Sequence, residues 1–249
     1  MTIKKIKEFI NHNQYEFIHI NSTQSTMISL KNFLNSKNKN CIVLSDQQTL
    51  GRGRRGNFWH SPKGNIYCSI SFENLLDIRN HYLYSVLIAV SIKISLEKFN
   101  GKNIKFKWPN DIFYKNDKFG GIIIETHKVN EGSEYMIVGF GININSSPEI
   151  EEYPTTHVKN FCNIKNLIGF LLELYKNLFI NLDLLENNNF NSIINLYKDS
   201  LMFLGESIKI KLSDNSIITG VFKDINNDGS MQLENDSKLL NIYNGSIKI

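Results

Sequence analysis

The sequence predicts an α+β fold in two parts, a mixed domain over residues 1–202 and a small β-barrel over residues 203–249. Before residue 203, segments with helical periodicity are interspersed with short apolar runs typical of strands. After residue 203, short strand-like runs recur at regular spacing, with turn residues such as Asn226-Asn227-Asp228-Gly229 between them. These two patterns predict a mixed sheet with helices, followed by an all-β module.

The mixed domain begins with a short amphipathic helix over residues 2–11, in which apolar residues recur among lysines. The helix from about residue 79 to 99 is apolar on most of its surface, which predicts that it is buried. Residues 112–125 form a predicted hairpin around the turn at 115–118. The remaining predicted elements are strands at 17–20, 41–44, 66–72, 104–108 and 135–140, helices at 27–34, 167–179 and 189–199, and barrel strands at 207–212, 217–222, 230–233 and 238–243, with a last one after Asn244-Gly245.

Composition excludes few classes of function. Hydrophobic residues make up 41% and charged residues 21%, as in ordinary globular proteins, and the net charge of +4 suits an anionic substrate as well as nucleic acid. No apolar run approaches the roughly 20 residues of a membrane span, and no signal-peptide pattern opens the chain. Cys41, Cys68 and Cys162 are far apart, which predicts reduced thiols and a cytoplasmic protein without a membrane partner.

One loop carries most of the chemical information. Gly51-Arg52-Gly53-Arg54-Arg55-Gly56 follows the strand at 41–44 and Gln48. Glycine lets the backbone approach a ligand closely, and arginine offers a planar cation suited to phosphate or carboxylate. The loop is therefore interpreted as an anion-binding segment that closes over its ligand. A solvated basic turn and a nucleic-acid patch are the alternatives.

A second informative stretch runs from Ile104 to Asp111. Alternation along a strand places Ile104, Phe106 and Trp108 on one face and the lysines, including Lys107, on the other. A lysine at the end of a strand, beside a polar turn, can direct its ammonium group at a phosphate. The alternative is an exposed sheet lysine.

A third stretch, residues 21–26, consists of cap-forming polar residues between a strand and a helix. Such a helix N-terminus attracts polar or anionic ligands. A plain N-cap is the alternative.

Four segments stand in one order: Ser22-Thr23-Gln24, then Gln48 to Gly56, then Lys107-Trp108-Pro109-Asn110-Asp111, then the segments 121–125 and 139–145. In this combination the chain resembles the biotin protein ligases from about residue 17 to its end. The resemblance implies a catalytic domain related to class II aminoacyl-tRNA synthetases, followed by an SH3-like barrel.

The resemblance also implies the activity. Biotin is activated with Mg-ATP to biotinyl-5′-AMP, and a lysine of a biotin carboxyl carrier domain then takes the biotin as an amide. Lys107 and Arg54 are the implied catalytic residues. The implied biotin-binding residues are Ser22, Thr23, Gln24, Gln48, Arg52, Gly53, Arg54, Lys107 and Gly121. The implied ATP-binding residues are Arg54, Arg55, Trp59, Lys107, Asn110 and Asn143, with Asp111 on the metal side; the metal ligands themselves stay open.

Two positions depart from the family pattern. Gln24 stands where the family usually has Asn, so the amide reaches further, and Asn57 stands where a further basic residue is common. About twenty residues precede the first motif, so we expect no helix-turn-helix domain and no nucleic-acid partner. Strands near residues 139–145 are expected at a sheet edge, where they could pair in a homodimer.

Two other functions were weighed. A phosphate- or nucleic-acid-binding module would carry more basic residues and interleaved aromatic residues on the barrel strands, and the barrel is close to charge-balanced. A lipoate or octanoate transferase would share the fold, but the resemblance implies that those relatives lack the Gly/Arg loop. A biotin protein ligase is the interpretation that the sequence favours.

Overall fold

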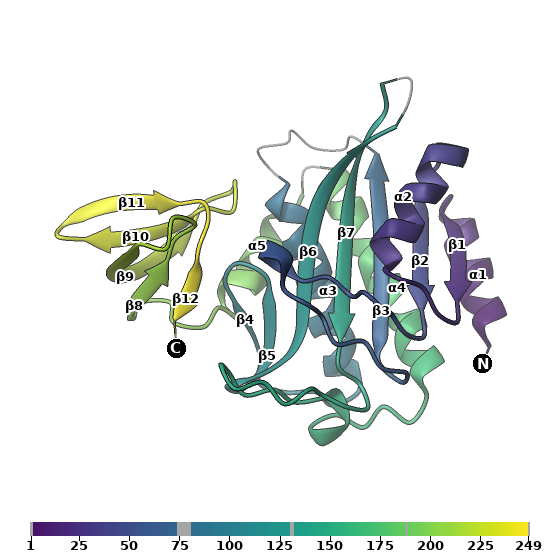
Figure 1. The fold of residues 1–249 in the computed structure, drawn as a ribbon, viewed down its shortest axis with the longest axis horizontal. Helices are drawn as coiled ribbons and strands as arrows, with labels where there is room; N and C mark the ends of the chain where they lie inside the picture. The colour runs from purple at the N-terminus through teal and green to yellow at the C-terminus, as the bar shows by residue number, and fades with distance from the viewer. Residues whose placement is uncertain (1, 74–80, 130–131, 188, 249) are drawn as a thin grey trace.

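The computed structural model describes residues 2–73, 81–129, 132–187 and 189–248, and contains two sheets (Figure 1). The larger sheet has seven strands in the order β1-β2-β3-β7-β6-β5-β4, and the smaller has five in the order β11-β10-β9-β8-β12. In the larger sheet, β1 pairs in parallel with β2, and the other neighbours pair in antiparallel orientation. The expected α+β class, with a small β domain at the C-terminal end, is confirmed.

The strands are β1 (Glu16–Ile20), β2 (Cys41–Ser45), β3 (Ile66–Glu73), β4 (Ile104–Lys107), β5 (Asp111–Tyr114), β6 (Asp117–Lys128), β7 (Glu134–Ile142), β8 (Ser207–Lys211), β9 (Ile217–Ile225), β10 (Met231–Asn235), β11 (Lys238–Ile242) and β12 (Ser246–Lys248). The α-helices are α1 (Ile3–His12), α2 (Thr26–Lys37), α3 (Tyr82–Lys98), α4 (Leu167–Glu186) and α5 (Asn191–Lys198).

The seven-stranded sheet separates two layers. Helices α3 and α4 lie behind it in Figure 1, whereas α2 and the loop after β2 lie in front. The rear layer packs into the main core, in which α1, α3, α4 and α5 bury apolar residues against the sheet. A smaller core beneath α2 contains Met27, Leu30 and Leu34. The loop after β2 thus crosses the front face of the sheet, between α2 and the small domain.

Two sequence predictions need correction. The predicted turn at 115–118 is shorter, because β6 already begins at Asp117 and pairs with β5 through a bulge between Ile112 and Phe113. The expected edge position is wrong for residues 139–142, because β7 pairs with β3 on one side and β6 on the other. Residues 143–145 follow the end of β7. The predicted start of the third helix, Arg79, lies outside the described residues.

Hydrogen bonds of the linker and of side chains, among them the one from Lys198 of α5 to Asp224 of β9, attach the small domain. The linker follows the outer edge of β4, where the backbone N–H of Phe106 donates to Ser200 O and that of Met202 donates to Phe106 O, both at 2.8 Å. In addition, Nε1 of Trp108 donates to the backbone oxygen of Gly229, in the β9–β10 turn, at 2.9 Å. Trp108 is 2% exposed. A buried hydrogen bond thus joins the end of β4 to the small domain.

The three cysteines are buried and free. Burial raises the pKa of both Cys41 and Cys68 to about 12. At pH 8 only about one thiol in ten thousand is then ionised, and the thiolate is the reactive form. We therefore expect iodoacetamide at pH 8 to leave Cys41 and Cys68 unmodified in the native protein and to modify all three cysteines in guanidinium, as read by peptide mass spectrometry. Native-state labelling of either residue at the rate of a free thiol would contradict this.

Within the described ranges, none of the helices is both long enough and apolar enough to cross a membrane.

Candidate functional site

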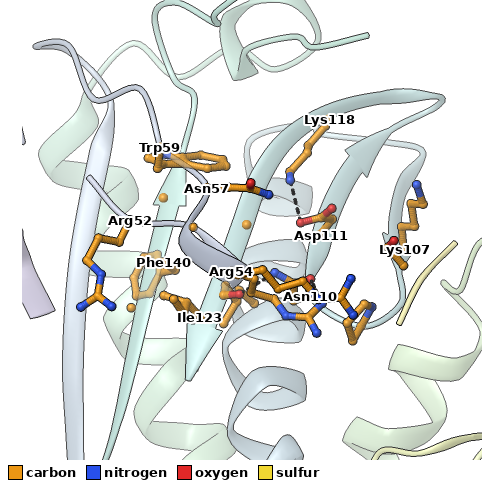
Figure 2. A pocket seen from close by; sticks show the side chains of 18 of the residues that line it. Arg52, Arg54, Asn57, Trp59, Lys107, Asn110, Asp111, Lys118, Ile123 and Phe140 are labelled. Atoms are coloured by element: carbon orange, nitrogen blue, oxygen red, sulfur yellow. Dashed lines mark hydrogen bonds and ion pairs between the residues drawn. The ribbon is translucent and has the colours of Figure 1, made fainter. Parts of the chain in front are cut away.

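A cavity of about 430 Å³ opens on the front face of the large sheet. Segments that are far apart in the sequence line it: residues 25–27, 48–59, 107–113, 118–123, 139–141, 152–153 and 245–248 contribute. The last group comes from β12 and the turn before it, so both domains contribute to the wall. Figure 2 shows side chains of residues that line this cavity.

The Gly/Arg loop forms one wall of the cavity. It folds as a narrow hairpin, in which Arg52 bridges to Phe58 and the backbone N–H of Gly53 donates to Asn57 O at 2.7 Å. Arg55 has φ of 56° and Gly56 has φ of 79°, so the chain reverses through two left-handed residues. This reversal turns the arginine side chains in different directions.

Arg54 points into the cavity and binds the turn after β4. Its Nη1 donates to Oδ1 of Asn110 at 3.1 Å, and the Asn110 amide in turn donates to Ile122 O at 2.7 Å. Burial, followed by the nearby Arg55, lowers the pKa of Arg54, but a guanidinium stays charged at neutral pH. The structure therefore brings together two sequence-predicted residues, Arg54 and Asn110.

Lys118 and Asp111 face each other across the β5–β6 hairpin (Figure 2). Lys118 Nζ lies 2.8 Å from Asp111 Oδ1, and it lies 5.5 Å from the ring centroid of Trp59. Lys118 is 13% exposed and Asp111 24%. Lys118 lines this cavity and also a neighbouring one, so it stands where the two meet.

Lys107 lies at the margin of the same cavity, with Nζ 5.8 Å from the ring centroid of Phe113. Burial lowers the pKa of Lys107, Asp111 opposes this shift, and Lys118 and Lys248 add to it. A bound anion would restore the pKa, because an opposite charge favours the ammonium form. Lys107, Lys118 and Arg54 make this end of the cavity strongly cationic.

Glycines form the floor beneath Trp59. Gly121 on β6 and Gly141 on β7 are direct partners in the sheet. A methyl group on Gly141 would lie 2.4 Å from Nε1 of Trp59, and one on Gly121 would lie 3.1 Å from its Cζ3. The ring thus rests directly on the backbone of the sheet, and side chains at these positions would displace it.

Gly141→Ala is expected to lower the free energy of unfolding by about 1–3 kcal/mol, because the rigid indole and the sheet backbone must separate. The displacement of Trp59 would also shift the intrinsic fluorescence. Urea unfolding and fluorescence spectra check both effects. Gly169→Ala in α4 is the matched control, since its methyl group would meet nothing closer than 3.6 Å. Equal stability of the two variants would contradict the packing described.

The amide of Gln48 anchors the other end of the cavity. Gln48 Oε1 accepts from the backbone N–H of Thr26 at 2.9 Å and from its hydroxyl at 3.2 Å, and Nε2 donates to Ser61 Oγ at 3.0 Å. Thr26 also bonds Ser69 Oγ at 2.7 Å. Gln48 therefore caps α2 and fixes the start of the loop, while it lines the cavity.

Of the predicted polar cluster, Ser22, Thr23 and Gln24 do not line the cavity; Ser25, Thr26 and Met27 do. Ser22 Oγ accepts from Gln47, and Thr23 Oγ1 is 2.8 Å from Ser29 Oγ. The cluster lies next to the loop through backbone bonds, with Thr49 N–H donating to Thr23 O and Leu50 N–H to Gln24 O. The helix period of α2, not the polar character of residues 22–24, decides which side chains face inward.

Asn143 does not line the main cavity. It borders a neighbouring cavity of about 460 Å³, which Phe58, Trp59 and Lys118 share with the first. Its Nδ2 donates to Thr156 O at 3.2 Å, whereas its buried Oδ1 has no partner in the structure. Arg52, Gly53, Arg55 and Gly121, by contrast, all line the main cavity as expected.

Among the residues that the structure describes, no group of three or more His, Cys, Asp or Glu side chains is placed to hold a metal ion. Asp111 is the central carboxylate of the cavity. One carboxylate together with substrate phosphates is a donor set that suits Mg²⁺.

The sequence interpretation did not single out Lys118 or Met27. The sequence places Lys118 in a predicted turn, and the signal that could have found it is the Gly120-Gly121 pair after Phe119, whose close backbone approach marks the same strand as part of a site. Met27 reads as an ordinary core residue of an amphipathic helix.

Residues 17–143 match the model of the Biotin/lipoate A/B protein ligase family. The chain belongs to this family. Residues 203–248 match the Biotin protein ligase C terminal domain, which covers the five-stranded sheet. The family match contains the Gly/Arg loop, Lys107, Lys118 and Gly121, so its boundaries enclose nearly the whole cavity wall.

Within the family, the chain is 33% identical over 130 residues to the bifunctional ligase/repressor BirA of Bacillus subtilis, covering 52% of this chain and 39% of the relative. It is 31% identical over 143 residues to the human biotin–protein ligase, covering 54% and 19%. The chain thus spans about two fifths or less of the length of these two relatives. A biotin protein ligase from Aquifex aeolicus, solved with biotin and ATP, has the same fold, with a TM-score of 0.77 at 24% identity over 93% of this chain and 97% of that one.

Proposed function

We propose that the chain is an ATP-dependent biotin protein ligase, which forms biotinyl-5′-AMP and transfers biotin to a lysine of a biotin carboxyl carrier domain. The observation that carries the proposal is the charge pattern of one cavity. Arg54, Lys107 and Lys118 gather at one end, and a largely apolar end with the Gln48 amide lies opposite. Such a cavity suits an acid with an apolar body, joined at its carboxylate to a phosphate.

In the first half-reaction, a carboxylate oxygen of biotin attacks the α-phosphorus of ATP, and pyrophosphate leaves with the electron pair of the broken P–O bond. Two anions must approach each other, and negative charge builds up around phosphorus. Fixed cations reduce that repulsion and stabilise the transition state. Lys118 lies at the junction of the two cavities and is best placed to contact both reacting groups, while Arg54 and Lys107 supply charge from either side.

In the second half-reaction, the amine of the carrier lysine attacks the acyl carbon of the mixed anhydride, and AMP leaves. The intermediate must be kept from water until the carrier arrives. The Gly/Arg loop covers the cavity between Arg52 and Phe58, and Trp59 closes the space above the glycine floor. Exclusion of water by such a cover protects a hydrolysable intermediate.

The neighbouring cavity is the proposed place of the nucleoside part of ATP. It joins the main cavity at Lys118 and Trp59, and the unpartnered Oδ1 of Asn143 offers an acceptor for an amino group. An acceptor buried without a partner favours a ligand that donates a hydrogen bond. Asp111 and the phosphate oxygens would hold Mg²⁺, which supplies charge neutralisation for the departing pyrophosphate.

The proposed reaction also implies a protein partner and a cellular location. A carrier domain of a biotin-dependent carboxylase, in the cytoplasm, is the proposed partner. Strand β7, which contains residues 139–142, is internal to the sheet, so pairing of this strand with a second chain is not part of the proposal.

The test is a reaction with biotin, Mg-ATP and an acceptor carrier domain, followed by intact mass of the acceptor and detection of the adenylate. A biotin-sized mass gain supports the proposal. Parallel reactions with lipoate and octanoate identify the acid. Formation of lipoyl or octanoyl adenylate without biotinyl adenylate would show that the substrate is that acid and not biotin. If none of the three adenylates forms, the ligase function is refuted.

A further inference from the structure

Lys118, the cation at the junction of the two cavities, has a second aromatic neighbour in Tyr153. Its Nζ lies 5.1 Å from the ring centroid of Tyr153, in addition to the 5.5 Å from that of Trp59 and the 2.8 Å from Oδ1 of Asp111. Both rings are within the roughly 6 Å at which an aromatic ring attracts an ammonium group. In Figure 2 the ammonium group of Lys118 points at Asp111. One carboxylate and two rings thus contact this cation.

The chain that carries Tyr153 is bound to Lys118 through the backbone. Tyr153 belongs to the loop after β7, which supplies one wall of the neighbouring cavity. The N–H of Lys118 donates to Pro154 O at 3.0 Å, and the N–H of Thr156 donates to Lys118 O at 2.9 Å. The residue directly after Tyr153 is therefore tied to the lysine whose ammonium group the Tyr153 ring contacts.

The two kinds of contact affect the lysine differently. A lysine side chain is a point charge on a flexible stem, and a cation stabilises developing charge best when it is already in place. Asp111 restrains the ammonium group but offsets its charge. A ring attracts the cation through its face, without adding an opposite net charge and without accepting along a conventional N–H···O bond. The rings can therefore restrain Lys118 and leave its charge available to the substrates.

We propose that Tyr153 is a positioning residue, whose ring holds the ammonium group of Lys118 at the junction of the two cavities during adenylate formation. The inference rests on the proposed function, in which Lys118 is the cation that contacts both reacting groups. Tyr153 lines both cavities, as Lys118 does, so it stands at the same junction. The effect comes from the ring and does not need the hydroxyl group.

The test measures kcat and KM for adenylate formation by pyrophosphate release. Tyr153→Leu keeps an apolar side chain but removes the ring, so we expect kcat to fall by about threefold to tenfold, the size of one cation–π contact at a partly desolvated site. Tyr153→Phe keeps the ring and should retain kcat within about twofold of wild type. Tyr243→Leu, at an exposed tyrosine of the small domain, is the matched control and should not lower kcat.

The decisive variant combines Tyr153→Leu with Lys118→Ala. Because Tyr153 acts through Lys118, the double variant should have the kcat of Lys118→Ala alone. Mere damage to the loop would lower kcat by the same factor whether or not Lys118 is present.

Four results would overturn the proposal and leave the ligase function standing: wild-type kcat in Tyr153→Leu, an equal loss in Tyr153→Phe, a loss confined to KM, or a further loss in the double variant. If the wild-type protein forms no adenylate with biotin, lipoate or octanoate, the proposed function and this proposal are both refuted.

Discussion

Lys118→Ala is expected to lower the rate of adenylate formation by about 100- to 1,000-fold, the usual effect of removing one preorganised group that stabilises developing charge. Lys118 is the cation held at the junction of the two cavities, 2.8 Å from Asp111. Without Lys118, the carboxylate of Asp111 would face the phosphates unpaired. Its repulsion of the phosphates would add to the loss of their attraction to Lys118. Pyrophosphate release with biotin and Mg-ATP measures the effect.

Lys107→Ala, the substitution that the sequence alone would put first, is expected to have a smaller effect of about tenfold, because Lys107 lines the main cavity but not the neighbouring one, and its Nζ lies beside the ring of Phe113. Lys105→Ala is the matched control on the same strand; Lys105 is exposed and does not line the cavity. A larger loss in Lys107→Ala than in Lys118→Ala would reverse the assignment of the two lysines. Circular dichroism of all three variants would verify that the fold is retained.

Trp108→Ala is expected to lower the free energy of unfolding by about 3–5 kcal/mol, the cost of truncating a large buried aromatic residue. The indole fills space beside the small domain, with its Cζ3 at 3.6 Å from the position of a methyl group on Gly245, and its Nε1 donates to Gly229 O. Its neighbours Lys107 and Asn110 belong to the cavity wall, so adenylate formation should fall as well. Urea unfolding measures the stability.

Trp108→Phe separates packing from hydrogen bonding. It keeps most of the apolar volume but leaves the Gly229 oxygen without its donor, so a loss of about 1–3 kcal/mol is expected. Leu239→Ala, at an exposed leucine of the small domain, should change stability by less than about 0.5 kcal/mol. Wild-type stability in Trp108→Ala would show that the small domain is held by other contacts.

Local patterns predicted the elements of the fold well. Alternation along residues 104–108 correctly placed Phe106 and Trp108 in the core, because a strand with one buried face repeats every two residues. The same reasoning failed at residues 115–118, where charged residues suggested a turn. There β6 begins at Asp117 because Asp117 and Lys118 pair with Tyr114 and Phe113 of β5, next to the bulge, and this pairing is not encoded within the segment itself.

The candidate site was predictable in its motifs but not in its geometry. The Gly/Arg loop and Asn110 were identified from residue type, yet the contact between Arg54 and Asn110 joins segments that are more than fifty residues apart. The inward direction of Ser25 and Thr26, in place of Ser22 and Thr23, depends on where α2 begins and on its cap from Gln48. The contacts of Glu125 with Lys31 and Arg52 join strand β6 to α2 and to the Gly/Arg loop. Such relations arise from tertiary packing, which a single sequence does not display.

The glycine floor limits how the cavity could be redesigned. Enlarging a pocket normally means shortening side chains, but Gly121 and Gly141 have none to shorten. A variant meant to accept a bulkier acid, such as a labelled biotin analogue, must gain its room at Met27 or Ile123, the two side chains that lie against Gly139. Substitutions that widen the cavity are therefore expected on α2 and β6. The glycines of β7 have no side chain to remove, so a substitution there can only make the cavity shallower.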